Sequence, residues 1–279
     1  MTDQQSTPDT LSLREAAEQL DVHYMTAYRY VRLGMLPASQ EGRTWVVRVQ
    51  DLEDFRASPS SASDRGAADW EARLFARMVD GDTSGAWAVT EAALASGMTP
   101  KAAYEDLLVT ALSEVGNKWI AGEVDIAQEH AASQVATRIV GRLAPQMARR
   151  GVPRGTVVLG STRTELHTLP ASLAADLIRH AGFRVIELGV NLPPGSFARS
   201  LLAQPDALAA AISVTMSGQE GEVADTVSAI REVSGVPVIV GGAGISAGDA
   251  LKAGADDYAR SAGDAIAILE KLRDARSDA

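Results

Sequence analysis

Four apolar runs in the C-terminal part of the chain alternate with helix-forming segments. The runs are TVVLGS, RVIELGV, LAAAISVTM and VPVIVGGA, and they are separated by LPASLAADLIRHAG, PGSFARSLLAQ and GEVADTVSAIREVSG. Continuous β-branched runs that alternate with helices are typical of a parallel sheet covered on both faces. The pattern therefore predicts an α/β, Rossmann-like (flavodoxin-like) domain over 150–279, with any ligand at the carboxyl ends of the strands.

Two breaks, RASPSSASDRG at 56–66 and ARRGVPRG at 148–155, separate this domain from the rest. We interpret 58–66 as a linker. The part between the breaks, 67–149, has no strand pattern and is predicted to be a four-helix bundle. Its helices are expected at about 67–80, 83–96, 100–121 and 124–148. The third carries an apolar stripe at the spacing of a buried face: Leu108, Ala111, Leu112, Val115 and Trp119.

The N-terminal segment 1–57 carries the pattern of a winged helix-turn-helix. Ser12 and Glu15 have the spacing of a capping box, a tight turn at DVH leads to a second helix, and a short hairpin follows around Gly42. The segment resembles the excisionase and MerR type of DNA-binding domain in REAAEQLDV, TAYRYVRLGMLP and VRVQDLEDF. The expected partner is a double-stranded DNA operator. The residues expected to contact it lie on the second helix and the wing: Tyr24, Thr26, Tyr28, Arg29, Arg32, Arg43 and Arg48.

Composition narrows the class of protein further. The formal net charge of −10 argues against a chain that mainly coats nucleic acid, so a single head should bind DNA weakly. Such small heads also sometimes bind protein instead of DNA. The chain has no cysteine, which excludes disulfides and thiolate metal sites. No apolar run approaches the ~18 residues needed to span a bilayer, so we expect a cytoplasmic protein without a membrane partner.

Three kinds of ligand compete for the sheet edge. Gly242, Gly244 and Ala247 form a near GxGxxG, but this lies on a late strand without the expected downstream acidic residue, which disfavours a dinucleotide. The second kind is a metal or a phosphate. A zinc site would need more ligands than His167 and Glu165 supply, and a hydrolytic site would need a GxSxG elbow, which is absent.

The third kind of ligand is a corrinoid. The C-terminal domain resembles the cobalamin-binding domain shared by methionine synthase, corrinoid shuttle proteins and B12-dependent regulators. The family pattern is D-x-H-x-x-G, then S-x-L or S-x-T, then G-G. The matching residues follow in that order: Glu165, His167, Pro170, Ser213, Thr215, Gly241 and Gly242. Glu165 replaces the usual Asp, and Pro170 replaces the usual Gly.

The resemblance implies that His167 is the lower axial ligand of cobalt, a role that suits a neutral imidazole. A carboxylate at Glu165 would accept the other ring N–H and fix the tautomer. The displaced dimethylbenzimidazole would lie at the sheet edge, where Ser213 and Thr215 could hydrogen-bond it. The two glycines, Gly241 and Gly242, would let backbone approach closely.

The bundle carries WIAGEVDIAQEH, a W-x9-E-H spacing that resembles the CarH family of B12-dependent light-sensing repressors. Those regulators share the order of head, bundle and cobalamin domain. The resemblance implies that the bundle caps adenosylcobalamin, with Trp119 on the adenosyl group and Glu129 and His130 lining its pocket. Ile120 stands where well-known members have a histidine that binds cobalt after photolysis.

The leading hypothesis is a non-enzymatic transcriptional regulator, a repressor, whose DNA binding and homo-oligomeric state (tetramer or dimer) depend on adenosylcobalamin and on light. The alternative is a cobalamin-dependent methyl-transfer corrinoid protein with an added head. A third possibility is a regulator that binds another nucleotide-like molecule and leaves His167 without a metal.

Overall fold

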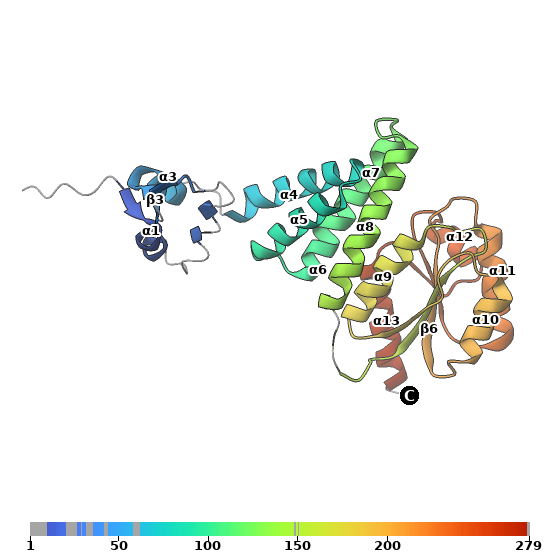
Figure 1. The fold of residues 1–279 in the computed structure, drawn as a ribbon. Coiled ribbons are helices and arrows are strands. Elements are labelled where there is room, and N and C mark those ends of the chain that lie inside the picture. Colours follow the sequence, from blue (N-terminus) through green and yellow to red (C-terminus); the bar gives the residue numbers. More distant parts are fainter. Residues whose placement is uncertain are drawn as a thin grey trace, which may run out of the picture. The chain divides into compact units, whose positions relative to one another are not determined.

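The computed structural model describes residues 10–20, 27–28, 30–31, 36–41, 44–57, 62–147, 149 and 151–277 (Figure 1). The chain divides into two compact units, Met1–Asp69 and Trp70–Ala279. The domain boundaries expected from the sequence, including the one between bundle and sheet domain, stay predictions. None of the described helices is long and apolar enough to cross a membrane.

The first unit is a small antiparallel sheet with helices. Its elements are β1 (Thr10–Ser12), α1 (Leu13–Gln19), β2 (Ser39–Glu41), β3 (Thr44–Arg48) and α3 (Val49–Ala57). The strands lie in the order β1-β3-β2, and β2 and β3 form the expected hairpin, with Glu41 opposite Thr44. Ser12 and Glu15 form a capping box, because the Glu15 N–H donates to Ser12 Oγ and the Ser12 N–H donates to Glu15 Oε2.

A bundle of helices begins the second unit. It comprises α4 (Ala62–Val79), α5 (Thr83–Ala95), α6 (Pro100–Ala102), a π-helical segment η1 (Ala103–Val109), α7 (Thr110–Ile120) and α8 (Ile126–Met147). The four helical stretches agree with those expected, but η1 interrupts the third. Helix α4 begins at Ala62, inside the segment 58–66, and the role of that segment as a linker stays a prediction. The core includes Leu108, Ala111 and Val115, as predicted from their spacing, and Leu112 packs against it partly buried. The prediction is wrong for Trp119, which is 47% exposed because it lies in the last turn of α7, at the end of the bundle.

The sheet domain forms the rest of the second unit. Its strands are β4 (Thr156–Ser161), β5 (Arg184–Glu187), β6 (Ala207–Ser213), β7 (Val238–Gly241) and β8 (Asp257–Ala259). Its helices are α9 (Thr168–His180), α10 (Pro194–Leu202), α11 (Glu220–Val233), α12 (Ala247–Lys252) and α13 (Ala262–Ser277). All strand pairs are parallel, in the order β5-β4-β6-β7-β8. This order is that of a flavodoxin-like sheet, which confirms the predicted fold class.

Helices cover both faces of this sheet (Figure 1). On one face, α9 and α13 pack against alternate strand residues such as Leu159 and Ile239. On the other face, α10, α11 and α12 pack against Val158, Ile212 and Val240. The bundle joins the domain through α9, because Leu177 of α9 belongs to the bundle's own core. The carboxyl ends of β4, β6 and β7 therefore lie beside α9.

Candidate functional site

His167 ends the loop between β4 and α9 and caps the start of that helix in an extended conformation. Its side chain is 53% exposed, and its Nδ1 lies 2.7 Å from Glu165 Oε1. A carboxylate at Nδ1 favours the tautomer with the proton on Nδ1, which leaves Nε2 as a lone-pair donor. No hydrogen bond to Nε2 is made by the residues that the structure describes. This ring nitrogen is therefore available to a metal.

Glu165 is a fully buried carboxylate that joins two loops. Its Oε1 accepts the His167 N–H at 2.9 Å, and its Oε2 accepts the N–H groups of Thr215 and Met216 at 2.7 and 2.8 Å. Burial by itself raises the pKa of Glu165, but the N–H donors of Met216, His167 and Thr215 outweigh it and lower this pKa below its ordinary value. The Glu165 carboxylate is thus an anion held against the imidazole of His167.

The turn before Glu165 is held in an unusual backbone conformation. Thr164 has φ 71° and Asn191 has φ 54°, both in the left-handed region. The Thr164 N–H donates to Asn191 Oδ1 at 3.0 Å, and the Asn191 N–H donates to the Glu165 carbonyl at 2.9 Å. The hydroxyls of Thr162 and Thr164 each donate to the amide oxygen of Gln219 at 3.2 Å. The sequence analysis did not single out Thr164, Asn191 or Gln219, because only the tertiary fold brings them together.

Gly241 and Gly242 end β7 at positions where no other residue fits. A Cβ on Gly241 would collide with the Ala259 carbonyl oxygen, and one on Gly242 would collide with the Val214 carbonyl oxygen. Gly242 also has φ 116°. The backbone that approaches these glycines is therefore this chain's own. The two residues nevertheless line the cavity described next.

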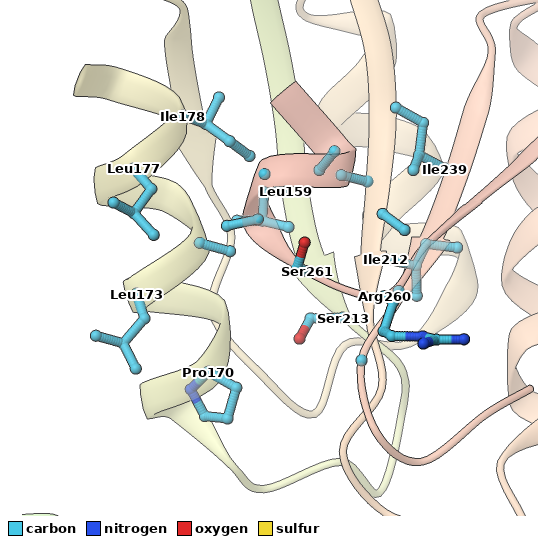
Figure 2. A pocket seen from close by; sticks show the side chains of 18 of the residues that line it. Leu159, Pro170, Leu173, Leu177, Ile178, Ile212, Ser213, Ile239, Arg260 and Ser261 are labelled. Atoms are coloured by element: carbon cyan, nitrogen blue, oxygen red, sulfur yellow. The ribbon is translucent and has the colours of Figure 1, made fainter. Parts of the chain in front are cut away.

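A cavity of about 520 Å³ lies between α9, α13 and the carboxyl ends of the strands (Figure 2). Leu173 and Leu177 of α9 and Leu159 of β4 line it, and Ser213 and Ser261 add hydroxyl groups. Pro170 also lines the cavity, from the first turn of α9. The volume of the cavity falls in the range of roughly 300–1,000 Å³ that is usual for small-molecule sites.

Ser213 lies on the wall of this cavity, but Thr215 does not. Thr215 contributes its backbone N–H to the site, which donates to the Glu165 carboxylate. Beside Ser213 in register, Ser161 ends β4, and its buried Oγ has no hydrogen-bond partner. Orphaned buried hydroxyls are uncommon in folded proteins. Ser161 does not line the cavity, so among the residues that the structure describes its hydroxyl is an unpaired buried group beside the site.

The residues expected to cap the ligand lie where α7 ends and α8 begins. Trp119 is 47% exposed, and the neighbouring Ile120 is 79% exposed. Glu129 accepts a hydrogen bond from Ser133, and its Oε2 lies 3.6 Å from His130 Nε2. Helices α7 and α8 are consecutive, so all these residues share one end of the bundle (Figure 1). Their roles toward a ligand stay predictions.

The predicted DNA contacts fall mostly outside the described residues: Tyr24, Thr26, Arg29, Arg32 and Arg43. Tyr28 is half-buried, and its ring makes an edge contact with Trp45 of the hairpin. Arg48 is exposed and forms an ion pair with Asp51 at 2.8 Å. Both residues belong to the predicted reading surface, and their contact with DNA stays a prediction.

No group of three or more His, Asp or Glu side chains among the described residues is arranged to hold a metal ion. A corrin ring supplies the equatorial nitrogens of its cobalt and needs one protein ligand on the lower face. The exposed imidazole of His167, oriented by the buried Glu165 carboxylate, supplies the kind of nitrogen donor that such a cobalt would accept. The residues present therefore fit a corrinoid.

Three domain families match the chain. Residues 155–269 match a B12 binding domain, residues 70–144 match a second family described as a B12 binding domain, and residues 10–59 match a helix-turn-helix domain. The helix-turn-helix match covers the predicted head. The two B12 matches cover most of the predicted bundle and sheet domain.

Individual proteins show the same two likenesses. The chain is 30% identical over 199 residues to the trimethylamine corrinoid protein of Methanosarcina barkeri, covering 69% of this chain and 91% of that protein. It is 34% identical over 152 residues to the HTH-type transcriptional repressor CarH of Myxococcus xanthus, covering 53% of this chain and 49% of the repressor.

A solved structure supports the fold. The monomethylamine corrinoid protein of Methanosarcina barkeri superposes with a TM-score of 0.67 at 20% identity, covering 73% of this chain and 99% of that chain. At this identity the likeness concerns the fold alone.

Proposed function

Because the chain belongs to the family of B12-binding corrinoid proteins and carries a helix-turn-helix domain ahead of both B12-binding domains, we propose that it is an adenosylcobalamin-dependent transcriptional repressor. The cofactor and light would control its oligomeric state and its binding to operator DNA. The protein would act by binding and release, without catalysing a reaction.

The observation that carries the proposal is the pair formed by Glu165 and His167. The imidazole stands exposed at the sheet edge with its Nδ1 on a buried carboxylate. His167 would hold cobalt through Nε2, and Glu165 would retain the proton on Nδ1 and orient the ring. Ser213 would donate to or accept from the base of the lower nucleotide in the adjoining cavity.

When bound, adenosylcobalamin supplies a cobalt–carbon bond that green light can cleave. In the proposed arrangement Trp119 packs on the adenosyl group, and Glu129 and His130 line the pocket around it. The exposure of Trp119 supports this role, because a half-exposed tryptophan at a helix end gains buried area when a ligand covers it.

The coupling to DNA would be one of avidity. A single head has few positive charges and should bind an operator weakly, whereas a dimer or tetramer presents several heads to one DNA. Cofactor contacts to both bundle and sheet domain would fix their surfaces for self-association. Loss of the adenosyl group would weaken that association.

Gel filtration tests this proposal directly. The full-length protein is run with and without adenosylcobalamin, in the dark and after green light. We expect a larger species only in the dark sample with cofactor, and we expect the same sample to bind operator DNA most tightly. A monomer of unchanged size in all four samples would contradict the proposal.

The absorption spectrum tests the lower ligand. The spectrum of protein mixed with adenosylcobalamin is recorded beside that of His167→Ala. We expect the variant to lose the cofactor or to give the base-off spectrum. His180→Ala is the matched control, because His180 lies at the other end of α9, with its Nδ1 on the Met147 carbonyl.

A corrinoid methyl carrier with an added head is the second candidate. The likeness to two trimethylamine corrinoid proteins favours it, since they match about two thirds of the chain. Comparing the affinities for methylcobalamin and adenosylcobalamin separates the two functions. A clear preference for the methyl form would favour the carrier.

A further inference from the structure

The cavity beside His167 is apolar almost throughout its depth. Its side chains come from α9 (Leu173, Leu177) and from the sheet (Leu159, Ile239), as Figure 2 shows. Two charged residues, Glu105 and Arg260, also line the cavity. Glu105 is ion-paired with Lys101, and Arg260 is exposed to solvent.

Two hydroxyls interrupt this apolar lining, and they are not equivalent. Ser261 caps α13, because its Oγ accepts the Asp264 N–H at 3.1 Å. Ser213 Oγ makes no hydrogen bond with any residue that the structure describes. The side chains of the wall therefore offer a ligand the Ser213 hydroxyl and the remaining hydroxyl hydrogen of Ser261, together with a large apolar surface.

A cavity with this lining would favour some bases of corrinoid lower nucleotides over others. A benzimidazole that has left cobalt carries a single free ring nitrogen, which Ser213 can satisfy, and its remaining surface is hydrocarbon. A purine such as adenine adds ring nitrogens and an amino group. Polar groups that are buried without hydrogen-bond partners cost affinity.

We propose that this cavity makes the protein selective for corrinoids with a benzimidazole-type lower base over those with a purine base, with Leu173 and Ser213 as specificity-determining residues. The inference rests on the proposed function, in which His167 displaces the base from cobalt. It adds the class of corrinoid that the site selects.

The test is a titration of the full-length protein in the dark, followed by absorbance. The probes are the adenosyl forms of cobalamin, of the adenine-containing cobamide, and of cobinamide, which lacks the lower nucleotide. We expect cobalamin to bind at least tenfold more tightly than either of the other two. Equal affinity for the two cobamides, or for cobalamin and cobinamide, would overturn the selectivity and leave the proposed function standing. Failure to bind any of the three would overturn both.

Two variants locate the selectivity. Ser213→Ala removes only the hydroxyl, so we expect weaker binding of cobalamin and unchanged binding of cobinamide. Leu173→Gln adds an amide to the wall, so the ratio of the two cobamide affinities should fall by severalfold. Leu202→Gln is the matched control, because Leu202 is an exposed leucine of α10 outside the cavity. Unchanged affinities in Ser213→Ala and an unchanged ratio in Leu173→Gln would contradict the assignment of these residues.

Discussion

Glu165 shows how one side chain serves both the site and the fold. Its carboxylate holds the imidazole of His167 and accepts two backbone N–H groups from the loop after β6. Among the residues that the structure describes, no lysine or arginine forms an ion pair with this buried anion. Its stabilising effect depends on charge, because a neutral group accepts these hydrogen bonds less strongly.

Replacing this carboxylate should destabilise the protein in a pH-dependent way. We expect Glu165→Gln to lower the free energy of unfolding by about 1–3 kcal/mol at pH 7. The pKa of Glu165 is lowered in the folded state from an ordinary value of 4.5. The stabilisation is therefore fully present above pH 4.5 and is lost as pH falls through the lower folded-state pKa. Urea unfolding between pH 7 and pH 3, in wild type and variant, measures it. A difference that stays constant over this range would contradict the assignment.

Thr164 provides a second residue-scale prediction. Its φ of 71° disfavours any residue with a Cβ, and β-branched residues most. Both Thr164→Ala and Thr164→Gly lose the hydroxyl that bonds Gln219, but only glycine relieves the strain. We expect the glycine variant to be more stable than the alanine variant by about 1–2 kcal/mol, measured by thermal or urea unfolding. Equal stabilities would show that the turn is not strained.

At the scale of elements, η1 and α9 join the bundle to the sheet domain. Tyr104 of η1 is fully buried and donates its hydroxyl hydrogen to Asp176 of α9 at 2.7 Å. Burial, and then the bonded Asp176 carboxylate, raise the pKa of Tyr104. Arg179 bonds the other carboxylate oxygen at 3.0 Å and reaches Glu187 of β5. Because His167 precedes the first residue of α9, these bonds connect the bundle to the helix that begins at the candidate site.

Removing the Tyr104 hydroxyl should loosen this connection. We expect Tyr104→Phe to lower the free energy of unfolding by about 1–3 kcal/mol, because it leaves a carboxylate oxygen without its donor. A double-mutant cycle with Asp176→Ala isolates the contact, since the two changes should not be additive. Additive effects would contradict a direct interaction.

At the scale of the whole molecule, every predicted ligand-binding residue lies in the unit Trp70–Ala279, and every predicted DNA-contacting residue lies in the unit Met1–Asp69. The two predicted functions thus fall on separate compact units.

Separating the units should separate the functions. We expect a fragment of residues 62–279, which keeps α4 whole, to bind adenosylcobalamin with an affinity within about threefold of the full chain and to lose operator binding. Absorbance titration and gel shift measure the two properties. Loss of cobalamin binding in a fragment that remains folded by circular dichroism would show that the head contributes to the ligand site.

Local patterns were sufficient to predict the features that depend on a few neighbouring residues. The capping box of Ser12 and Glu15, the stripe of the third helix and the alternation of strands and helices all act over one or two turns or strands. The Glu165 and His167 contact belongs to this class, because two residues of loop keep the side chains within reach. Helix α4 begins at Ala62, before the predicted start at about residue 67, since a Ser-rich run does not by itself prevent the adjoining segment from being helical.

The sequence by itself therefore determined the parallel sheet, its helical neighbours and the pairing of His167 with a carboxylate, because these follow from local periodicity and spacing. Only the tertiary structure decided what fixes that carboxylate, because Thr215 and Met216 reach it from a loop some fifty residues away. It also decided that Gly242 makes room for the chain's own backbone and that Leu173 and Ser213 line one cavity. Contacts of this kind depend on how α9, α13 and the strand ends pack together, and no local pattern encodes that packing.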